Sequence, residues 1–106
     1  MPNLIFKHED KRRIILEWIK DFPIRRCKVI VAKQDTELGN HYHKKNKDII
    51  YLLSGKGWYK LGKGRFKLIK NVVTIPENVR HTFRLKKGAI VLEASTKPFD
   101  IKDEIK

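Results

Sequence analysis

Two histidines one residue apart, His41 and His43, are the side chains of this sequence best suited to chemistry. In a β-strand, residues two apart point to the same face, so the two imidazoles would lie side by side while Tyr42 faces the other way. A third imidazole, His81, and the carboxylate of Asp48 stand at the beginning of two later apolar segments. Strands that bring these four side chains together would form a functional site.

Three imidazoles and a carboxylate are a ligand set for a divalent transition metal. Imidazole nitrogen suits zinc, iron and nickel, and a carboxylate oxygen widens the choice to manganese. The sequence therefore predicts a metal site with the ligands His41, His43, Asp48 and His81. The histidine pair alone would look the same as two solvated histidines on a polar strand face, so the case for a site depends on the fold.

The segments around these residues mostly follow a period of two, which is typical of β-strands. Residues 13–19 (RIILEWI) and 24–32 (IRRCKVIVA) are rich in β-branched and apolar residues, and Pro23 separates them. The spacing of Ile14 and Trp18 also allows a short helix in the first segment, but the run lacks clear helix caps. We therefore predict strands in both segments.

A polar stretch, residues 34–40, precedes the histidine pair, and the turn-like residues 44–47 follow it. The apolar run DIIYLLS then begins at Asp48, so the sequence predicts a β-hairpin between the two segments. Alternation places Asp48, Ile50 and Leu52 on one face of the second strand and the residues between them on the opposite face.

Short apolar segments punctuated by glycines continue towards the end of the sequence. The predicted strands are GWYKL, RFKLI, VVTIP, HTFRL and AIVLEAS, and in HTFRL His81 and Phe83 share one face. Many short strands without a helix of ordinary length indicate a sandwich or a barrel, and a closed barrel removes exposed edge strands. We predict an all-β single domain over residues 1–106, with a charged tail that ends in one short turn of helix.

Composition limits the classes of function. The single cysteine, Cys27, cannot form an internal disulfide, and no window approaches the roughly 20 apolar residues of a membrane span. We therefore expect a soluble, cytoplasmic protein that does not bind membranes. The formal net charge of +13 is spread in one- and two-residue insertions, and no nucleic-acid-binding motif is present. A lysine-rich solvated surface is favoured over nucleic-acid binding, and attraction of anionic small molecules stays open.

The spacing of the candidate residues resembles the two sequence motifs of the cupin superfamily. The first motif has two histidines one residue apart, then an acidic residue, then a glycine six residues further on. At those places this sequence has His41, His43, Asp48 and Gly55. The second motif has proline, glycine and histidine, matched here by residues 76–81 with Asn78 in place of the glycine. Asparagine also tolerates the left-handed backbone region that the glycine would adopt.

The resemblance implies a cupin-type β-barrel, also described as a double-stranded β-helix or jelly roll. It implies that His41, His43 and His81 line the barrel mouth and bind a divalent metal together with Asp48. Cupins usually have the longer glutamate at that position, so a water could complete the metal shell. Cupins of this size commonly pair through barrel faces, which implies a homodimer.

The N-terminal half is also similar to small RmlC-like cupins, which include sugar-nucleotide epimerases and ketoisomerases. This resemblance implies a metal-free alternative, in which His41 or His43 takes a proton next to a keto group. Tyr42 or Tyr51 would be the acid, although alternation turns both away from the cavity. Basic residues would hold the diphosphate of an anionic sugar nucleotide. The candidates are Arg25, Arg26, Arg80 and Lys45.

The sequence leaves two hypotheses open: a module that binds a metal or a small polar ligand, and a metal-free isomerase or epimerase. Glu93, in the strand AIVLEAS, is either a buried acid at the site or, in the interpretation we favour, an outward or rim residue. We expect Cys27 to be a small buried hydrophobic residue without chemistry. We expect Trp58 and Phe66 in the core or on a dimer face, and His8 in a solvated loop.

Overall fold

The structure, a computed structural model, describes residues 6–19, 21–98 and 100–106. The strands are β1 (Phe6–Glu9), β2 (Ile14–Glu17), β3 (Arg26–Val31), β4 (Thr36–His43), β5 (Asp48–Ser54), β6 (Gly57–Leu61), β7 (Lys67–Leu68), β8 (Val72–Ile75), β9 (His81–Leu85), β10 (Ile90–Ser95) and β11 (Glu104–Ile105). A short 3-10 helix, η1 (Ile101–Asp103), forms the turn expected in the charged tail. Within the described residues, no helix has the length and apolar character needed to cross a membrane.

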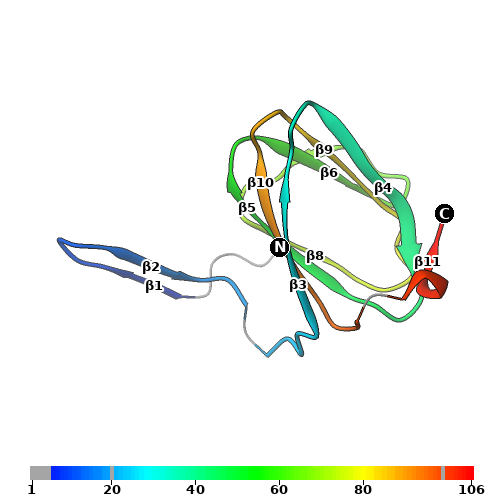
Figure 1. The fold of residues 1–106 in the computed structure, drawn as a ribbon, viewed down its shortest axis with the longest axis horizontal. Helices are drawn as coiled ribbons and strands as arrows, with labels where there is room; N and C mark the ends of the chain where they lie inside the picture. The colour runs from blue at the N-terminus through cyan, green and yellow to red at the C-terminus, as the bar shows by residue number, and fades with distance from the viewer. Residues whose placement is uncertain (1–5, 20, 99) are drawn as a thin grey trace.

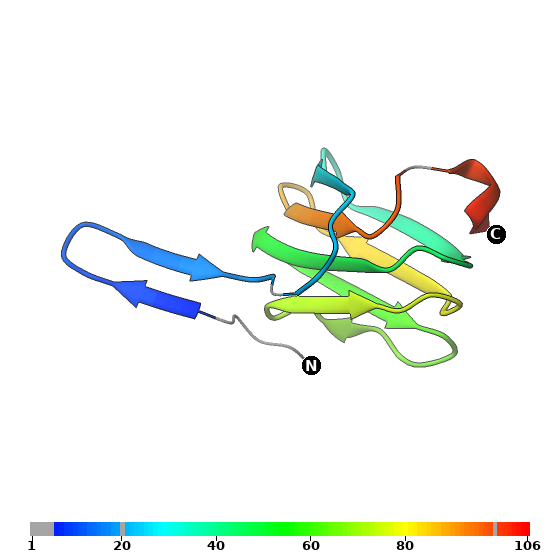
Figure 2. The same cartoon turned by 90° about the horizontal axis from the view of Figure 1, so that it is seen from below.

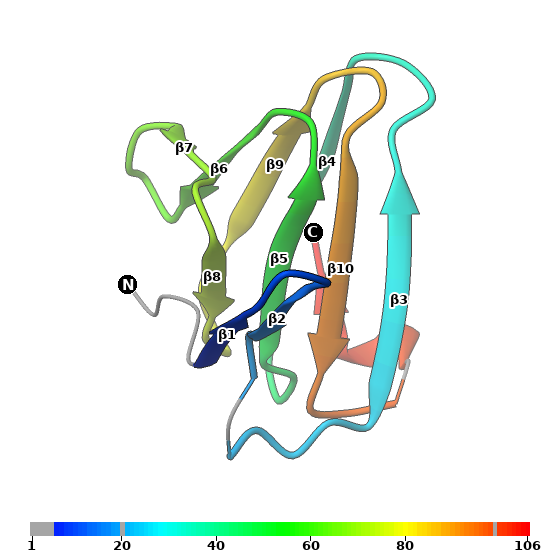
Figure 3. The ribbon, with the colours of Figure 1, turned by 90° about the vertical axis from the view of Figure 1, so that its left-hand side faces the viewer.

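Two antiparallel sheets face each other across the interior. One has the strand order β3-β10-β5-β8 and the other has the order β11-β4-β9-β6-β7. Figure 1 shows the strands of both sheets curving around one common interior. Figure 3 looks onto the outer side of the first sheet. This architecture confirms the prediction of an all-β jelly-roll barrel.

Apolar side chains at alternating strand positions fill the interior. In β5, Ile50 is 1% exposed and belongs to the main core, whereas Ile49 belongs to a second cluster on the opposite face. Asp48 lines the cavity at the barrel mouth and so shares the inner face with Ile50, as alternation predicted. Phe83 of β9 joins the same core from the other sheet. Complete burial of a large apolar side chain such as Ile50 stabilises the folded state by about 1.5–3 kcal/mol.

The hairpin predicted around the histidine pair is wrong, because β4 and β5 belong to different sheets. β4 pairs with β9 and β11, whereas β5 pairs with β8 and β10. Residues 44–47 cross from one sheet to the other, and the backbone N–H groups of Lys45 and Asn46 donate to the carboxylate of Asp103. Alternation indicates the face on which a side chain lies, but it does not identify the neighbouring strand.

β4 starts inside the stretch that the sequence analysis treated as a polar connection, and it carries a bulge. Between Leu38 and His41, β4 has one more residue than the opposing part of β9. Gly39 and Asn40 have φ angles of 91° and 60° there, in the region that glycine adopts freely and asparagine tolerates. Without the extra residue, alternation would direct Asn40 rather than His41 into the interior.

β1 and β2 pair with each other and form an N-terminal arm, residues 6–17. The strand predicted within residues 13–19 is confirmed, and the helical alternative is wrong. His8 lies in β1 rather than in a loop, and it is exposed beside Asp10 at 3.2 Å. Figures 1 and 2 show the arm projecting away from the barrel.

Cys27, which was expected to be buried, lies outside the core, and so do Trp58 and Phe66, which were expected in the core or on a dimer face. Cys27 is exposed on β3, so its assignment as a buried hydrophobic residue is wrong. Trp58 and Phe66 are only partly buried and line an outer cavity. The guanidinium of Arg84 lies 4.0 Å from the centre of the Phe66 ring. The core interpretation of these two aromatic residues is therefore also wrong.

Gly55 and Gly88 allow a matched test of the packing, because both have positive φ angles, of 87° and 90°. A Cβ at Gly55 would lie 2.7 Å from the Cα of Ala89, whereas a Cβ at Gly88 would meet nothing within 4 Å. We expect Gly88→Ala to lower the free energy of unfolding by about 1 kcal/mol through backbone strain. We expect Gly55→Ala to lower it by a further ~1–3 kcal/mol through the steric clash. Urea unfolding of both variants checks this, and equal losses would contradict the close contact at Gly55.

Candidate active site

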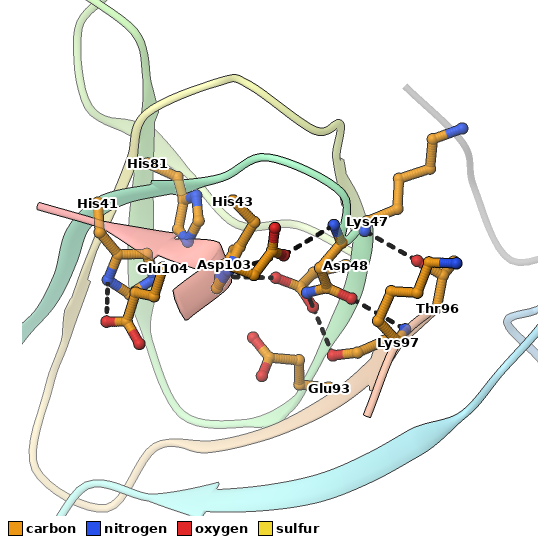
Figure 4. Close-up of polar contacts among 12 residues, drawn as sticks. His41, His43, Lys47, Asp48, His81, Glu93, Thr96, Lys97, Asp103 and Glu104 are labelled. Atoms are coloured by element: carbon orange, nitrogen blue, oxygen red, sulfur yellow. Dashed lines mark hydrogen bonds and ion pairs between the residues drawn. The ribbon is translucent and has the colours of Figure 1, made fainter. Parts of the chain in front are cut away.

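The predicted site residues lie in a cavity of about 330 Å³ at the mouth of the barrel. Strands β3, β4, β5, β9 and β10 contribute to its wall, and so does the C-terminal segment, residues 100–106. His41, His43, Asp48 and His81 all line this cavity. Figure 4 shows the three imidazoles gathered beside the carboxylates of the site. The structure therefore brings together all four residues that the sequence singled out.

The three imidazoles come from two neighbouring strands. The register between β4 and β9 sets His41 directly opposite His81, and His43 follows two residues later on β4. The His41 ring centre lies 4.9 Å from that of His43 and 4.6 Å from that of His81. One ring nitrogen from each histidine lies within 4.8 Å of the others. Asn78, in the turn before β9, has a φ of 63°, as expected for a residue that replaces glycine there.

Two of the imidazoles have one nitrogen beside an oxygen acceptor. Nδ1 of His41 lies 3.0 Å from Oε1 of Glu104. Nδ1 of His81 lies 3.3 Å from the carbonyl oxygen of Val79. A proton on Nδ1 donates to these oxygens, and in the neutral ring Nε2 then carries the lone pair. The hydrogen bond at Nδ1 therefore orients each ring, and Nε2 can bind a ligand or accept a proton.

Burial favours the neutral form of these two imidazoles. It lowers the pKa of His41, although the adjacent carboxylate of Glu104 opposes the effect. It lowers the pKa of His81 from 6.5 to about 4, with a smaller opposing contribution from its hydrogen bond to Val79. A neutral imidazole can accept a proton or ligate a metal, so the site suits both kinds of chemistry.

Asp48 is 3% exposed and lies beside the imidazoles. Its carboxylate accepts hydrogen bonds from Nδ2 of Asn46, at 2.9 Å, and from the hydroxyl of Ser95. Its other oxygen lies 3.8 Å from Nε2 of His43. The group of mutually close ligand atoms contains the three histidines and not Asp48. Asp48 is thus a neighbour of His43, and its role as a metal ligand stays a prediction.

Three acidic residues that the sequence analysis missed also line the cavity, and they are Asp100, Asp103 and Glu104. They come from the C-terminal segment, where β11 pairs with the end of β4. Asp103 accepts hydrogen bonds from the N–H groups of Lys45 and Asn46, at 2.9 and 3.1 Å, and lies 3.9 Å from Nδ1 of His43. No spacing in the sequence relates these acids to the histidines, because only tertiary packing brings the two segments together.

The favoured interpretation of Glu93 as an outward or rim residue is wrong. Glu93 is 8% exposed, lines the cavity and forms an ion pair with Nζ of Lys28 at 2.8 Å. Burial raises the pKa of its carboxyl group, and the nearby charge of Asp48 adds to that effect. The register explains its position, because Glu93 lies opposite Lys28 on one side and Ile50 on the other, both of which face inward.

The tyrosines considered as acids do not reach the cavity. Tyr51 packs against Trp18 on the outer side of its sheet, with ring centres 5.8 Å apart. The guanidinium of Arg80 lies 5.6 Å from the centre of the Tyr42 ring. Of the basic residues considered for a diphosphate, Arg26 lines the cavity. The other three candidates, Arg25, Arg80 and Lys45, are not part of its lining.

Several solved structures resemble this one. A 3,4-ketoisomerase from Helicobacter canadensis is 22% identical, with a TM-score of 0.83 over 98% of this chain and 86% of its own. The TDP-quinovose 3,4-ketoisomerase WlaRB from Campylobacter jejuni is 20% identical, with a TM-score of 0.84 over 98% of this chain and 88% of its own. The rmlC epimerase from Mycobacterium tuberculosis is 14% identical, with a TM-score of 0.79 over 96% of this chain and 65% of its own.

No protein-family model matches the sequence, and no curated protein matches it. These three structures are each less than 25% identical to the chain, so they establish a shared fold rather than a shared reaction. Two facing sheets, a histidine-lined mouth and these likenesses together identify the chain as a β-barrel with the RmlC-like cupin fold.

Proposed function

We propose that the protein is a metal-free isomerase that acts on a keto sugar linked to a nucleoside diphosphate. The observation that carries this proposal is the group of three imidazoles in the barrel mouth, two of which have pKa values lowered by burial. Proteins with the same fold are described as 3,4-ketoisomerases and epimerases, and two such structures contain TDP. A cavity of about 330 Å³ accommodates a sugar ring rather than a whole sugar nucleotide.

His41 is the best candidate for the base. The hydrogen bond from its Nδ1 to Glu104 orients the ring and leaves Nε2 to accept a proton. In a ketoisomerisation, the base removes the proton from the carbon next to the keto group and an enediol forms. The imidazolium then returns a proton to the former carbonyl carbon, so no oxidant or reductant is consumed. His43, with its ring centre 4.9 Å from that of His41, could carry the proton between the two carbons.

Glu93 is the candidate for the proton transfer between the two sugar oxygens. As the carbonyl moves to the neighbouring carbon, one oxygen gains a proton and the other loses one. Glu93 faces the cavity from β10, and burial raises the pKa of its carboxyl group, so protonating it costs less than protonating an exposed glutamate. In the proposed reaction its carboxylate takes the proton from the hydroxyl group, and the resulting carboxylic acid donates that proton to the oxygen of the former carbonyl group. This assignment replaces the tyrosines, which lie outside the cavity.

The charge of the lining favours a substrate that enters sugar first. The lining includes five carboxylates, those of Asp48, Glu93, Asp100, Asp103 and Glu104. Its cations other than histidine are Arg26, which donates to the hydroxyl of Ser95 at 3.5 Å, and Lys28, which is paired with Glu93. A diphosphate deep in the cavity would be repelled by these carboxylates, so in this proposal it stays at the rim on the side of Arg26.

A divalent metal site is the second candidate function, and the close approach of the three imidazoles favours it. A tetrahedral zinc ion about 2.1 Å from each nitrogen places the nitrogens about 3.4 Å apart. The ligand atoms now lie within 4.8 Å of one another, so the rings would have to move towards one another by up to about 1.4 Å to bind the ion. His41, His43 and His81 would hold the ion, and it would polarise a carbonyl or hydroxyl oxygen of a ligand.

Substitution of His41 tests the proposed reaction. We expect the wild-type protein to exchange solvent deuterium into a TDP-linked keto sugar, and His41→Asn to slow this exchange by about 10²–10⁴-fold because the base is removed. Mass spectrometry of the recovered sugar nucleotide measures the exchange. His8→Asn is the matched control, since it makes the same change at an exposed histidine on the arm. Absence of exchange in the wild-type protein, tested with several keto sugars, would count against the isomerase.

Metal analysis separates the two candidate functions. For the metal-free isomerase, we expect protein purified without a histidine tag to contain far less than one zinc, manganese, iron or nickel per chain. Added metal should also leave the melting temperature unchanged, whereas a ligand at about 100 times its dissociation constant stabilises a protein by about 2.7 kcal/mol. Stoichiometric metal that disappears in His81→Ala would instead support the second candidate.

The lowered pKa of His81 predicts that acid destabilises the metal-free protein. The folded-state pKa of about 4 lies below the ordinary 6.5, so between these pH values the unfolded state binds more protons. Stability should therefore fall as the pH drops from 6.5 to 4, by up to about 3 kcal/mol for this residue. Urea unfolding in EDTA at both pH values measures the loss. His81→Gln should show a smaller loss, and an unchanged pH dependence in that variant would contradict the assignment.

A further inference from the structure

Lys28 lines the barrel mouth and forms an ion pair with Glu93, the residue assigned to the proton transfer between the two sugar oxygens. Its Nζ lies 2.8 Å from Oε1 of Glu93, a distance typical of a charge-assisted hydrogen bond. The two side chains differ in exposure, because that of Lys28 is 47% exposed and that of Glu93 is 9% exposed. Water therefore solvates the ammonium group, whereas the carboxylate depends on groups of the protein.

The register of the sheet builds this ion pair. Lys28 on β3 lies directly opposite Glu93 on β10, and side chains at such positions are close neighbours on one face of a sheet. On its other side Glu93 lies opposite Ile50, which is 1% exposed and has no polar side-chain group. Within the described part of the chain, no hydrogen bond or ion pair joins Glu93 to an imidazole or to Asp48. In Figure 4 the Glu93 side chain extends from β10 into the site that the imidazoles border.

Opposing influences act on the charge of Glu93. Burial raises the pKa of its carboxyl group, and the negative charge of Asp48 raises it further. The hydrogen bond and the charge of Lys28 oppose this shift, with a smaller contribution from Arg26. Without Lys28, the groups that favour the carboxylic acid would therefore dominate. The other titratable residues that line this cavity belong to β4, β9 and the C-terminal segment, and they are His41, His43, His81, Asp100, Asp103 and Glu104.

We propose that Lys28 is a positioning residue for the proposed isomerisation: its ammonium group holds Glu93 in the cavity as a carboxylate, so that Glu93 begins the reaction as a base. This inference rests on the proposed function. The O–H bond of the sugar hydroxyl breaks as the O–H bond of the Glu93 carboxylic acid forms. That bond then breaks as the proton passes to the former carbonyl oxygen, and Glu93 is a carboxylate again. Lys28 keeps its own proton throughout.

A purely structural ion pair is the alternative role for Lys28. A buried carboxylate without a partner is unfavourable, so either role predicts some loss of stability when Lys28 is replaced. The positioning role makes two further predictions. It predicts that the pH dependence of isomerisation changes, and that isomerisation is affected more than the exchange of the carbon-bound proton, which depends on His41.

The pH dependence of the reaction tests the positioning role. We expect Lys28→Met to raise the pH at which isomerisation of a TDP-linked keto sugar is half-maximal by about one unit, which slows the reaction about tenfold on the acid side. Solvent deuterium exchange into the same sugar should slow much less. Lys28→Arg should restore the wild-type profile because it keeps the positive charge. Lys86→Met is the matched control, since it removes a lysine that is paired with Asp35 at 3.4 Å outside the cavity.

A titration of the Glu93 carboxyl group makes the test independent of the reaction. In ligand-free protein with ¹³C-labelled glutamate, the Glu93 signal is identified by its absence in Glu93→Gln. We expect Lys28→Met to raise the pH of half-protonation by about one unit and Lys28→Arg to leave it unchanged. Lys28→Gln provides a second neutral variant should Lys28→Met fail to fold.

The outcomes separate this inference from the proposed function. An active wild type with the same Glu93 titration in Lys28→Met would overturn the positioning role alone. Faster isomerisation by Lys28→Met below neutral pH would also overturn it, because Glu93 would then begin the reaction as an acid. A wild-type protein that neither exchanges deuterium nor isomerises any of the keto sugars tested would overturn the proposed function and the role of Lys28 with it.

Discussion

The pairing of β4 with β9 is the interaction on which the site depends. It sets His41 directly opposite His81, and the extra residue at the bulge makes His41 rather than Asn40 face the interior. Gly39 permits this approach, since a Cβ there would lie 2.9 Å from the carbonyl oxygen of His81. The end of β4 then pairs with β11, which brings Glu104 to Nδ1 of His41. β4 therefore contributes two of the three imidazoles, and its pairing with β9 and β11 places His81 and Glu104 beside them.

Strand alternation gives the two sides of the sheet β3-β10-β5-β8 different side chains. On β3 and β10, the inward side chains Lys28 and Glu93 belong to the mouth cavity. The side chains next to them in sequence, such as Val29 and Leu92, lie on the outer side of the sheet. Because successive residues point to opposite sides, the same short strands can form a polar site inside and an apolar surface outside. Burial in the mouth then lowers the pKa of His81 and raises that of Glu93.

The alternation of apolar and polar residues along the sequence predicted individual strands well. The predicted strands DIIYLLS and HTFRL correspond to β5 and β9 with the same first and last residues, and Asp48 faces inward as alternation required. The prediction failed where a strand's partner mattered. A turn-like tetrapeptide between two apolar runs looks the same whether it joins adjacent strands or crosses between sheets, so the hairpin after His43 was a wrong inference. Glu93 was misjudged because a charge among apolar residues usually faces water.

The sequence by itself determined the strand segments, the common face of His41 and His43 and the spacing that resembles the cupin motifs, because each follows from residues near one another in the chain. Only the tertiary structure decided that His81 meets this pair, that Asp103 and Glu104 join it from the C-terminal segment, and that one outer face is left uncovered. These features depend on which strands pair and in what register. Backbone hydrogen bonds are the same for every residue type except proline, so they do not favour one pairing over another, and the choice depends on how side chains from distant segments pack together.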